Sequence, residues 1–229
     1  MTIAYILAGT SVAVSVITAI LRNKGMEKGR FATKMLSSLL FCAAAFCAAV
    51  TREAMSGRAA LMFGALLLGL VGDIVLGLDQ FVLEDRRKHM FVLGGLPFFF
   101  GHLLYIALLL SYGNIHWGLA AVLPVVPVSF LLLSHFGLIK LEMTMVPLAL
   151  YGLVLGGMML ATFNLAMRGG ALGRWMWYPG VLFTISDASL FLNKFGQGPL
   201  KKCKLVFSYT VMLPYYAAQG IFALSVGLL

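Results

Sequence analysis

Charged residues are scarce in this sequence. Lys, Arg, Asp and Glu make up 11% of the 229 residues, while hydrophobic residues make up 61%; a soluble domain has roughly 25% charged residues. A water-soluble fold would therefore lack the polar side chains needed to cover its apolar ones. The mean hydropathy of +0.97 and the regular spacing of long apolar runs instead predict a membrane protein with spanning helices of about 20 residues.

Acidic residues are rarer still, with 8 Asp and Glu against 17 Lys and Arg, which gives a net charge of +9. Such an excess can indicate nucleic-acid binding. Here, however, the basic residues stand in short runs between apolar segments, where they set membrane orientation and attract anionic lipid. We therefore expect membrane lipids as partners and no nucleic acid. The sequence does not specify an oligomeric state.

Several features of common enzyme and secreted classes are missing. There is no CxxC pair, no even-numbered disulfide framework, no glycine-rich phosphate loop and no GxSxG elbow. The histidines fall at different depths in the topology described below, so they do not converge as the protein ligands of a zinc site do. We expect neither a metal nor a cofactor. The residues concerned are Cys42, Cys47, Cys203, His89, His102, His116 and His135.

Eight apolar stretches follow one another with short connections. Backbone groups in lipid must be satisfied within their own segment, so each stretch is expected to be a transmembrane helix. We predict an all-α integral membrane protein, with residues 1–229 forming one polytopic domain and one bundle. The stretches are Thr2–Leu21, Phe31–Val50, Arg58–Leu78, Met90–Ser111, Trp117–His135, Leu141–Ala166, Arg174–Asn193 and Cys203–Leu228.

Basic residues divide unequally between the two ends of these stretches. The loops after the odd-numbered stretches hold 13 of the 17 Lys and Arg residues and the other loops hold 4. The positive-inside rule then places the first set in the cytoplasm and both termini on the non-cytoplasmic side. We expect a multi-pass protein of a bacterial cell membrane. The smaller set is Arg52, Arg58, Arg168 and Arg174.

Two aspartates lie deep in apolar stretches. Asp73 stands in GLVGDIVLGL and Asp187 in LFTISDASLF, each about 8–9 Å from the predicted cytoplasmic end at 1.5 Å per residue. An ionisable group inside a membrane is costly and marks a candidate functional site. The matched depth favours a shared role, although either aspartate alone would also be explained as a brace between helices.

Other polar residues recur on single helix faces. His102 and Tyr105 share a face with Phe98, and the last stretch carries a stripe at three- and four-residue spacing. Structural readings stay open: His102 as a helix contact, the tyrosines as the wall of a cavity, and Lys34 as a snorkelling side chain. The stripe consists of Tyr209, Met212, Tyr215, Tyr216 and Gln219, which Tyr151 is expected to join.

Several of these segments resemble the YhhN-type lysoplasmalogenases. The similar pieces are LVGDIVLGL, GHLLY, LYGL, LFTISDASLFLNKF and YYAAQ, in family order from the third stretch onward. Lys34, in TKML, stands where the family usually has a lysine, although Met35 replaces the proline that usually follows. The resemblance implies that the two important aspartates of the family correspond to Asp73 and Asp187.

The resemblance also implies a reaction. Family members hydrolyse the vinyl ether bond of lysoplasmalogen to a fatty aldehyde and a glycerophospho-headgroup. Because many bacteria lack plasmalogens, a related lysolipid is also possible as the substrate. We expect Asp73 and Asp187 to be catalytic and a further set of residues to bind the lysophospholipid. That set is Lys34, His102, Tyr105, Tyr151, Tyr215, Tyr216 and Gln219.

The chemistry of a vinyl ether agrees with these residues independently. Hydrolysis begins by protonation of the β-carbon, which gives an oxocarbenium ion that water attacks. Burial disfavours the charged form of a carboxyl group and so keeps an acid protonated, while a second carboxylate can stabilise the cation, as in glycosidases. Two other functions use similar residues: a small-molecule or proton-coupled transporter, and a non-catalytic lipid-binding protein.

Overall fold

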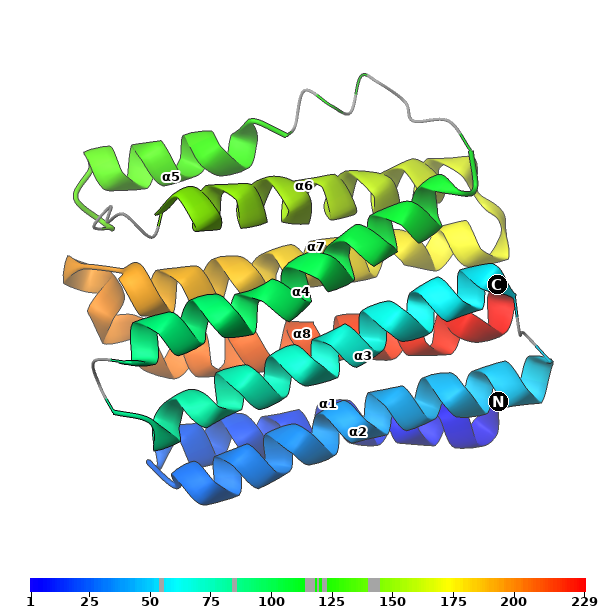
Figure 1. Cartoon of the computed structure of the whole chain (residues 1–229), viewed down its shortest axis with the longest axis horizontal. Coiled ribbons are helices and arrows are strands. Elements are labelled where there is room, and N and C mark those ends of the chain that lie inside the picture. The colour runs from blue at the N-terminus through cyan, green and yellow to red at the C-terminus, as the bar shows by residue number, and fades with distance from the viewer. Residues whose placement is uncertain (54–55, 84–85, 114–117, 119, 121–122, 140–144) are drawn as a thin grey trace.

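A computed structural model shows α-helices lying side by side along most of the chain (Figure 1). It describes residues 1–229 except 54–55, 84–85, 114–117, 119, 121–122 and 140–144. The described residues form α-helices and short 3₁₀ turns, and no strand occurs among them. The elements are α1 Thr2–Asn23, α2 Glu27–Arg52, α3 Gly57–Leu78, η1 Asp79–Phe81, α4 Arg87–Leu110, α5 Val125–His135, α6 Met145–Arg168, α7 Gly170–Phe195, η4 Gly198–Cys203, α8 Lys204–Ser225 and η5 Val226–Leu228.

Within the described residues, six helices are long and apolar enough to cross a membrane: α1, α2, α3, α4, α6 and α8. Their lipid-facing sides carry large exposed hydrophobic residues such as Phe46, Leu67 and Leu150. The chain is therefore an all-α, multi-pass membrane protein. The helix α7, although 26 residues long, is not among the six, because Arg174, Asp187 and other polar residues interrupt its apolar sequence. Eight crossings thus remain a prediction.

The fifth predicted helix is shorter than expected. An α-helix from Trp117 was predicted, but α5 begins at Val125 with Pro124 at its N-cap; Trp117 itself lies outside the described residues. A proline is tolerated at the start of a helix, because the first N–H groups of a helix have no intrahelical acceptor. In the interior a proline removes a backbone hydrogen bond and is costly. The 11 residues of α5 are about 16 Å long, roughly half of an apolar bilayer core.

Small residues allow the helices to approach one another closely. The buried face of α1 includes Ala4, Ala8 and Ser11, and it packs against α2 and α8. Elsewhere α3 packs against α4, and α7 lies between α6 and α8. Small side chains let helix backbones come close in lipid, where van der Waals packing replaces the hydrophobic effect as the driving force.

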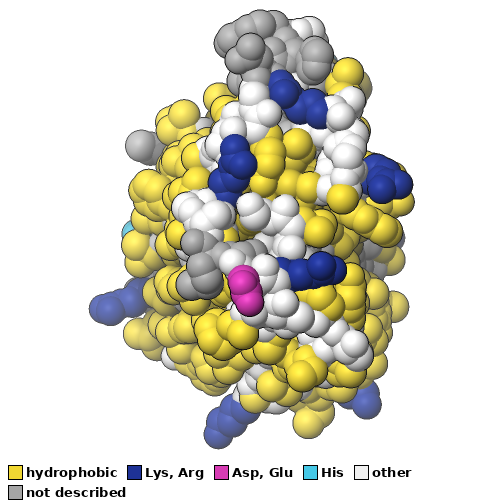
Figure 2. Space-filling view, turned by 90° about the vertical axis from the view of Figure 1, so that its right-hand side faces the viewer, with side chains coloured by type: hydrophobic (Ala, Val, Ile, Leu, Met, Phe, Trp, Pro, Cys, Tyr) yellow, Lys and Arg dark blue, Asp and Glu magenta, His cyan; other side chains and the backbone are white. Residues whose placement is uncertain are grey.

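Both termini lie at the same end of the helices, on the right of Figure 1. Figure 2 looks onto this end, where hydrophobic side chains predominate and Lys and Arg side chains are scattered among them. At the opposite end α1, α3, α5 and α7 finish and the helices that follow them begin. The larger basic set of the sequence belongs to those connections. Which end faces the cytoplasm stays a prediction from the charge distribution.

Candidate active site

Asp73 lies on α3 and is enclosed by side chains of α2 and α8. It is 2% exposed. One carboxylate oxygen, Oδ1, is 3.0 Å from the Lys34 ammonium. The other, Oδ2, accepts hydrogen bonds from the hydroxyls of Ser38 at 2.6 Å and Tyr215 at 2.8 Å, with the Tyr216 hydroxyl at 3.4 Å. We call these five residues the Asp73 cluster.

The sequence of α2 explains part of this arrangement. Lys34 and Ser38 are four residues apart, so they share one face of the helix. The Lys34 ammonium also donates to the Asp73 backbone carbonyl at 3.1 Å, and the Tyr216 hydroxyl donates to the Lys34 carbonyl at 3.1 Å. The groups around the Asp73 carboxylate are thus all hydrogen-bond donors to it. The ammonium thus contacts both the side chain and the backbone of Asp73.

Asp187 has a more open environment. Its Oδ2 accepts a hydrogen bond of 2.6 Å from the Tyr151 hydroxyl and is 3.4 Å from Nε2 of His102. The same ring nitrogen is 3.4 Å from the Tyr151 hydroxyl, and we call the three residues the Asp187 cluster. The Asp187 side chain is 13% exposed. Its second oxygen, Oδ1, makes no hydrogen bond within the described residues, so it can meet a ligand or water.

A polar chain extends from the Asp73 cluster, and an aromatic ring lies between the two clusters. Tyr105 donates to Oε1 of Gln219 at 2.7 Å, and the Gln219 amide donates to the Tyr215 hydroxyl at 3.1 Å. The Phe183 ring lies between the clusters, with centroid distances of 5.1 Å to His102 and 5.5 Å to Tyr215. No hydrogen bond joins Asp73 to Asp187 directly. The two carboxylates therefore belong to neighbouring but separate groups.

Two glycines of α3 make room for this polar chain. A Cβ atom at Gly69 would collide with the side-chain amide of Gln219, and a Cβ at Gly72 would lie 2.5 Å from the ring of Phe98. The Phe98 ring in turn packs edge-on against Tyr215 at 5.8 Å. These glycines permit α4 and α8 to approach α3 where Asp73 lies, so larger residues would disturb the site without touching its polar atoms.

Comparison with known proteins assigns the chain to a family. The profile of the YhhN family matches residues 29–226. The chain belongs to the YhhN family. The matched range includes both aspartates and every side chain of the two clusters. No solved structure matches the chain.

A relative within curated proteins carries the name lysoplasmalogenase TMEM86B and comes from Sus scrofa. It is 34% identical over 176 residues, which cover 76% of this chain and 66% of the relative. The chain thus aligns with slightly less than two thirds of the length of this relative. The resemblance seen in the sequence motifs is confirmed at the level of the family.

The structure brings together all nine residues singled out from the sequence. Lys34, Tyr215 and Tyr216 gather around Asp73, while His102 and Tyr151 gather around Asp187. Tyr105 and Gln219 extend the Asp73 cluster through Tyr215. Of the remaining stripe on α8, Met212 packs in the apolar core, and Tyr209 is only partly buried against it.

Sequence reasoning missed two residues of the site. Ser38 makes the shortest hydrogen bond to Asp73, and its position four residues after Lys34 was the signal that could have found it. Phe183, which is 1% exposed, stands four residues before Asp187 and so shares its helix face. A serine or phenylalanine in an apolar helix is too common for the sequence alone to mark it.

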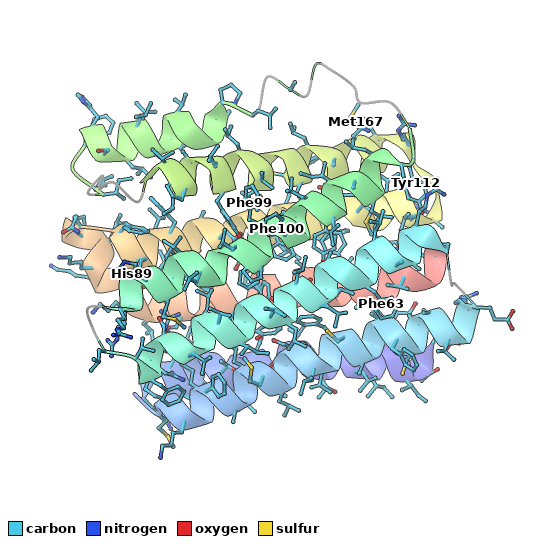
Figure 3. The ribbon with its side chains drawn as sticks, in the orientation of Figure 1. Phe63, His89, Phe99, Phe100, Tyr112 and Met167 are labelled. Carbon is cyan, nitrogen blue, oxygen red and sulfur yellow. The ribbon has the colours of Figure 1, made fainter. Side chains whose placement is uncertain are left out.

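The other described histidines lie away from these clusters. Figure 3 shows His89 at the beginning of α4, at the opposite end of that helix from Tyr112. His135 is the last residue of α5. In the described parts of the chain no three His, Cys, Asp or Glu side chains lie close enough to hold a metal ion. His116 falls outside the described residues.

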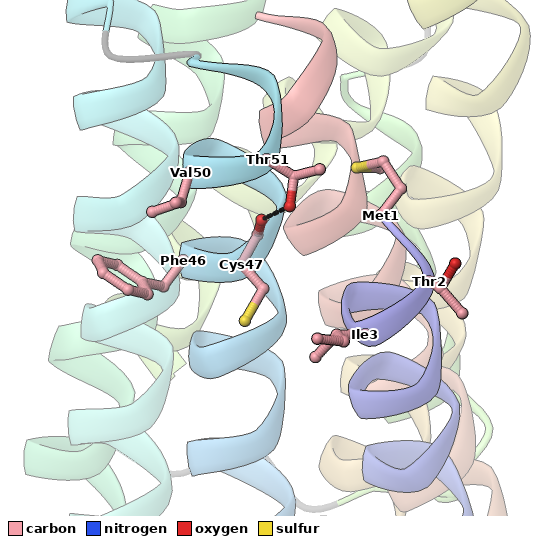
Figure 4. A pocket seen from close by; sticks show the side chains of 7 residues that line it. All are labelled: Met1, Thr2, Ile3, Phe46, Cys47, Val50 and Thr51. Carbon is pink, nitrogen blue, oxygen red and sulfur yellow. Dashed lines mark hydrogen bonds between the residues drawn. The ribbon is translucent and has the colours of Figure 1, made fainter.

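A groove between α1 and α2 lies at the end that carries the termini. It is lined by apolar and hydroxyl side chains and contains neither aspartate nor any of their partners (Figure 4). Because it holds no charged group, we assign it no role in the chemistry. Its lining residues are Met1, Thr2, Ile3, Phe46, Cys47, Val50 and Thr51.

Proposed function

We propose that this protein hydrolyses the vinyl ether bond of a lysoplasmalogen, or of a related lysolipid, to a fatty aldehyde and a glycerophospho-headgroup. The observation that carries the proposal is the open Oδ1 oxygen of Asp187 inside an apolar bundle, next to a second, fully paired carboxylate at Asp73. Membership of the YhhN family and a relative named as a lysoplasmalogenase support it.

Asp187 is the proton donor in this proposal. Vinyl ether hydrolysis needs an acid that reaches the β-carbon of the alkenyl chain, and of the two aspartates of the site Asp187 is the one with a carboxyl oxygen that has no protein partner. Its other oxygen is held by Tyr151 at 2.6 Å, which fixes the rotamer. General acid catalysis of this kind contributes about 10²–10⁴-fold to a rate.

Asp73 supplies a fixed negative charge. Its Oδ2 oxygen points to Tyr215, whose ring contacts Phe183, and Lys34 binds the opposite oxygen. Tyr215 and Phe183 thus link the Asp73 carboxylate to α7, the helix that carries Asp187. A charge held in place before the reaction stabilises a developing oxocarbenium ion without reorganisation, and it acts strongly in an apolar interior.

The steps balance with one water and no redox change. The Asp187 carboxyl proton moves to the β-carbon, which breaks the carbon–carbon π bond and leaves an oxocarbenium ion. Water adds to the α-carbon, and its released proton returns to the Asp187 carboxylate. The resulting hemiacetal then loses the glycerol oxygen, which takes up the hydroxyl proton, and an aldehyde remains.

We further propose that the end of the bundle nearer Asp73 faces the cytoplasm of a bacterial cell, on the strength of the basic residues in its loops. Cys203 lies at this end, in η4. In a Cys42→Ser, Cys47→Ser background, a membrane-impermeant maleimide should label Cys203 in inverted vesicles and not in intact spheroplasts. Labelling in spheroplasts alone would reverse the orientation.

The activity is tested directly with the purified protein in detergent. We expect fatty aldehyde from a lysoplasmalogen and none from the matching acyl lysophospholipid, because an ester does not follow vinyl ether chemistry. Detergent removes any sealed compartment, so aldehyde release distinguishes an enzyme from a transporter. A folded protein that releases no aldehyde from any vinyl ether lysolipid would refute the proposed function.

A further inference from the structure

Gln219 is a buried amide in the apolar interior of the bundle. It stands on α8 four residues after Tyr215, so the two side chains share a helix face. An amide in such a place is costly unless it is hydrogen-bonded. Here both of its ends are paired: Oε1 accepts from the Tyr105 hydroxyl at 2.7 Å, and Nε2 donates to the Tyr215 oxygen at 3.1 Å. The amide therefore connects two tyrosines, one on α4 and one on α8.

The hydrogen bonds of this polar chain all run in one direction. A carboxylate only accepts hydrogen bonds, so the Tyr215 hydroxyl, 2.8 Å from Oδ2 of Asp73, gives its single hydrogen to Asp73. The Tyr215 oxygen is then left as an acceptor, and Nε2 of Gln219 donates to it. With Nε2 on Tyr215, Oε1 faces Tyr105 and accepts its hydrogen. Every hydrogen of the polar chain is thus directed toward the Asp73 carboxylate.

The Tyr215 hydroxyl also has a second acceptor within reach. The backbone carbonyl of Gly69 lies 3.4 Å from it, and a hydroxyl hydrogen rotates to suit its neighbours. A donor on the oxygen of a hydroxyl polarises that hydroxyl and strengthens the bond that it makes in turn. The Gln219 amide therefore strengthens the bond from Tyr215 to Asp73, and this bond loses its support when the amide is removed.

The orientation of the amide is fixed by packing at both of its ends. The Tyr105 ring is stacked on the Phe222 ring, with a centroid distance of 4.1 Å and 18° between the planes, so its hydroxyl is held in place. On the side of α3 the amide lies against Gly69, where a Cβ atom would collide with it. The surroundings thus hold the Gln219 amide in the orientation that donates to Tyr215.

We propose that Gln219 is a positioning residue, which holds the Tyr215 hydroxyl as a donor to Asp73 and so fixes the Asp73 carboxylate. The proposal rests on the proposed function, in which Asp73 is the fixed charge that stabilises the oxocarbenium ion. Such a charge is effective because its orientation is set before the reaction. Among the described residues no hydrogen bond joins Gln219 to either aspartate, so its effect on turnover passes through Tyr215. This role differs from the lipid contact that the sequence led us to expect for Gln219 and Tyr105.

The first measurement is aldehyde release from a lysoplasmalogen by Gln219→Met in detergent. Methionine is similar to glutamine in length, but its thioether is only a weak acceptor. We expect kcat to fall about tenfold, the effect of one buried hydrogen bond, and KM to stay within twofold of wild type. A raised KM with unchanged kcat would identify Gln219 as a substrate contact and overturn the proposal. A kcat within twofold of wild type would also overturn it.

Double-mutant cycles show whether Gln219 acts through Tyr215. Tyr215→Phe alone removes the donor to Asp73, so the addition of Gln219→Met should not lower kcat further. The matched control is Tyr216, whose hydroxyl lies 3.4 Å from the same carboxylate oxygen but makes no described hydrogen bond with Gln219. In the Tyr216→Phe background Gln219→Met should keep its tenfold effect. A full tenfold effect in both backgrounds would show that Gln219 acts independently of Tyr215 and would overturn the proposal.

Tyr105→Phe is a milder variant that tests the same polar chain. It removes the hydroxyl that orients the amide and keeps the ring on Phe222, so we expect kcat to fall about threefold with KM unchanged. If Gln219→Met does not yield folded protein, Tyr105→Phe decides in its place, and a wild-type kcat would overturn the proposal. Ser225→Ala is the control, because the described hydrogen bond of this buried serine stays within α8, and its kcat should equal that of wild type.

Infrared spectroscopy tests the role of Gln219 without turnover. The tyrosines are labelled with ¹³C at the ring carbon that bears the hydroxyl, and the C–O stretching band of Tyr215 is assigned by its loss in Tyr215→Phe. The position of this band reports whether a tyrosine hydroxyl donates, accepts or does both. Wild-type protein should show a Tyr215 hydroxyl that does both, and Gln219→Met one that only donates.

The outcomes distinguish this proposal from the proposed function. If wild-type protein releases no aldehyde, the hydrolase proposal falls and the infrared band decides the role of Gln219: a changed Tyr215 band in Gln219→Met supports it and an unchanged band overturns it. If wild-type protein releases aldehyde while the band and kcat of Gln219→Met match those of wild type, the hydrolase proposal stands and the positioning role of Gln219 is wrong.

Discussion

Asp73 and Asp187 are both carboxylates in apolar helices, but their surroundings differ in every respect that decides a role. Asp73 has an ammonium at 3.0 Å on one oxygen and hydroxyl donors on the other, and it is 2% exposed. Asp187 has two neighbours on a single oxygen and is 13% exposed. A carboxylate whose two oxygens both have protein partners stabilises the structure and sets the local electric field. A carboxylate with one oxygen free of protein partners can exchange a proton with a ligand.

The strongest test of this comparison is Asp187→Asn. An amide cannot donate an acidic proton, so we expect kcat for aldehyde release to fall by about 10²–10⁴-fold, the range for general acid catalysis. The melting temperature in detergent should change little, because the described partners of Asp187 are Tyr151 and His102 and include no Lys or Arg. Retained turnover would exclude Asp187 as the acid, and the different surroundings of the two aspartates would then not correspond to different catalytic roles.

Asp73→Asn should have the opposite signature. It leaves the Lys34 ammonium buried without a counter-charge, and breaking one partner of a buried pair costs about 3–5 kcal/mol. We expect a clear loss in thermal stability of the detergent-solubilised protein as well as reduced turnover. The double variant Asp73→Asn, Lys34→Met should recover much of the stability but no activity. If Asp73→Asn alone were as stable as wild type, the Lys34–Asp73 ion pair would not contribute to the stability of the protein.

A pair of adjacent serines sharpens the description of the Asp73 cluster. Ser38→Ala removes the 2.6 Å hydrogen bond to Asp73, and a bond to a charged group contributes about 1.5–3 kcal/mol. Ser37→Ala is the matched control, because the Ser37 hydroxyl is equally buried but makes no hydrogen bond. In urea or thermal unfolding, the Ser38→Ala variant should be clearly less stable than the Ser37→Ala variant. The reverse order would contradict the geometry of the cluster.

The smallest expected effect is that of Tyr151→Phe in the Asp187 cluster. The change removes the hydroxyl that holds Oδ2 of Asp187 while keeping the ring, so the carboxyl gains rotational freedom. We expect kcat to fall by about tenfold, which corresponds to about 1.4 kcal/mol, with KM and the melting temperature nearly unchanged. The exposed Tyr178 offers a control, since Tyr178→Phe should leave kcat at the wild-type value.

Helix positions were largely predictable from the sequence, because a backbone in lipid must satisfy its own hydrogen bonds and so converts each long apolar run into a helix. The helix α3, predicted as Arg58–Leu78, is observed as Gly57–Leu78. The error in α5 arose at Pro124, where the helix begins, since hydropathy does not register the missing N–H of proline. Composition likewise indicated a membrane protein before any motif was considered.

The pairing of side chains was decided by the tertiary structure. Hydropathy and spacing marked Asp73 and Asp187 as costly residues, and the motifs placed both in the YhhN family. Neither signal stated that Lys34 and Ser38 bind one aspartate while Tyr151 and His102 bind the other. Those contacts join side chains of different helices, so they depend on how each helix is rotated about its axis and on how closely the helices approach one another. Sequence periodicity fixes the face of a helix, and only packing fixes which helix that face meets.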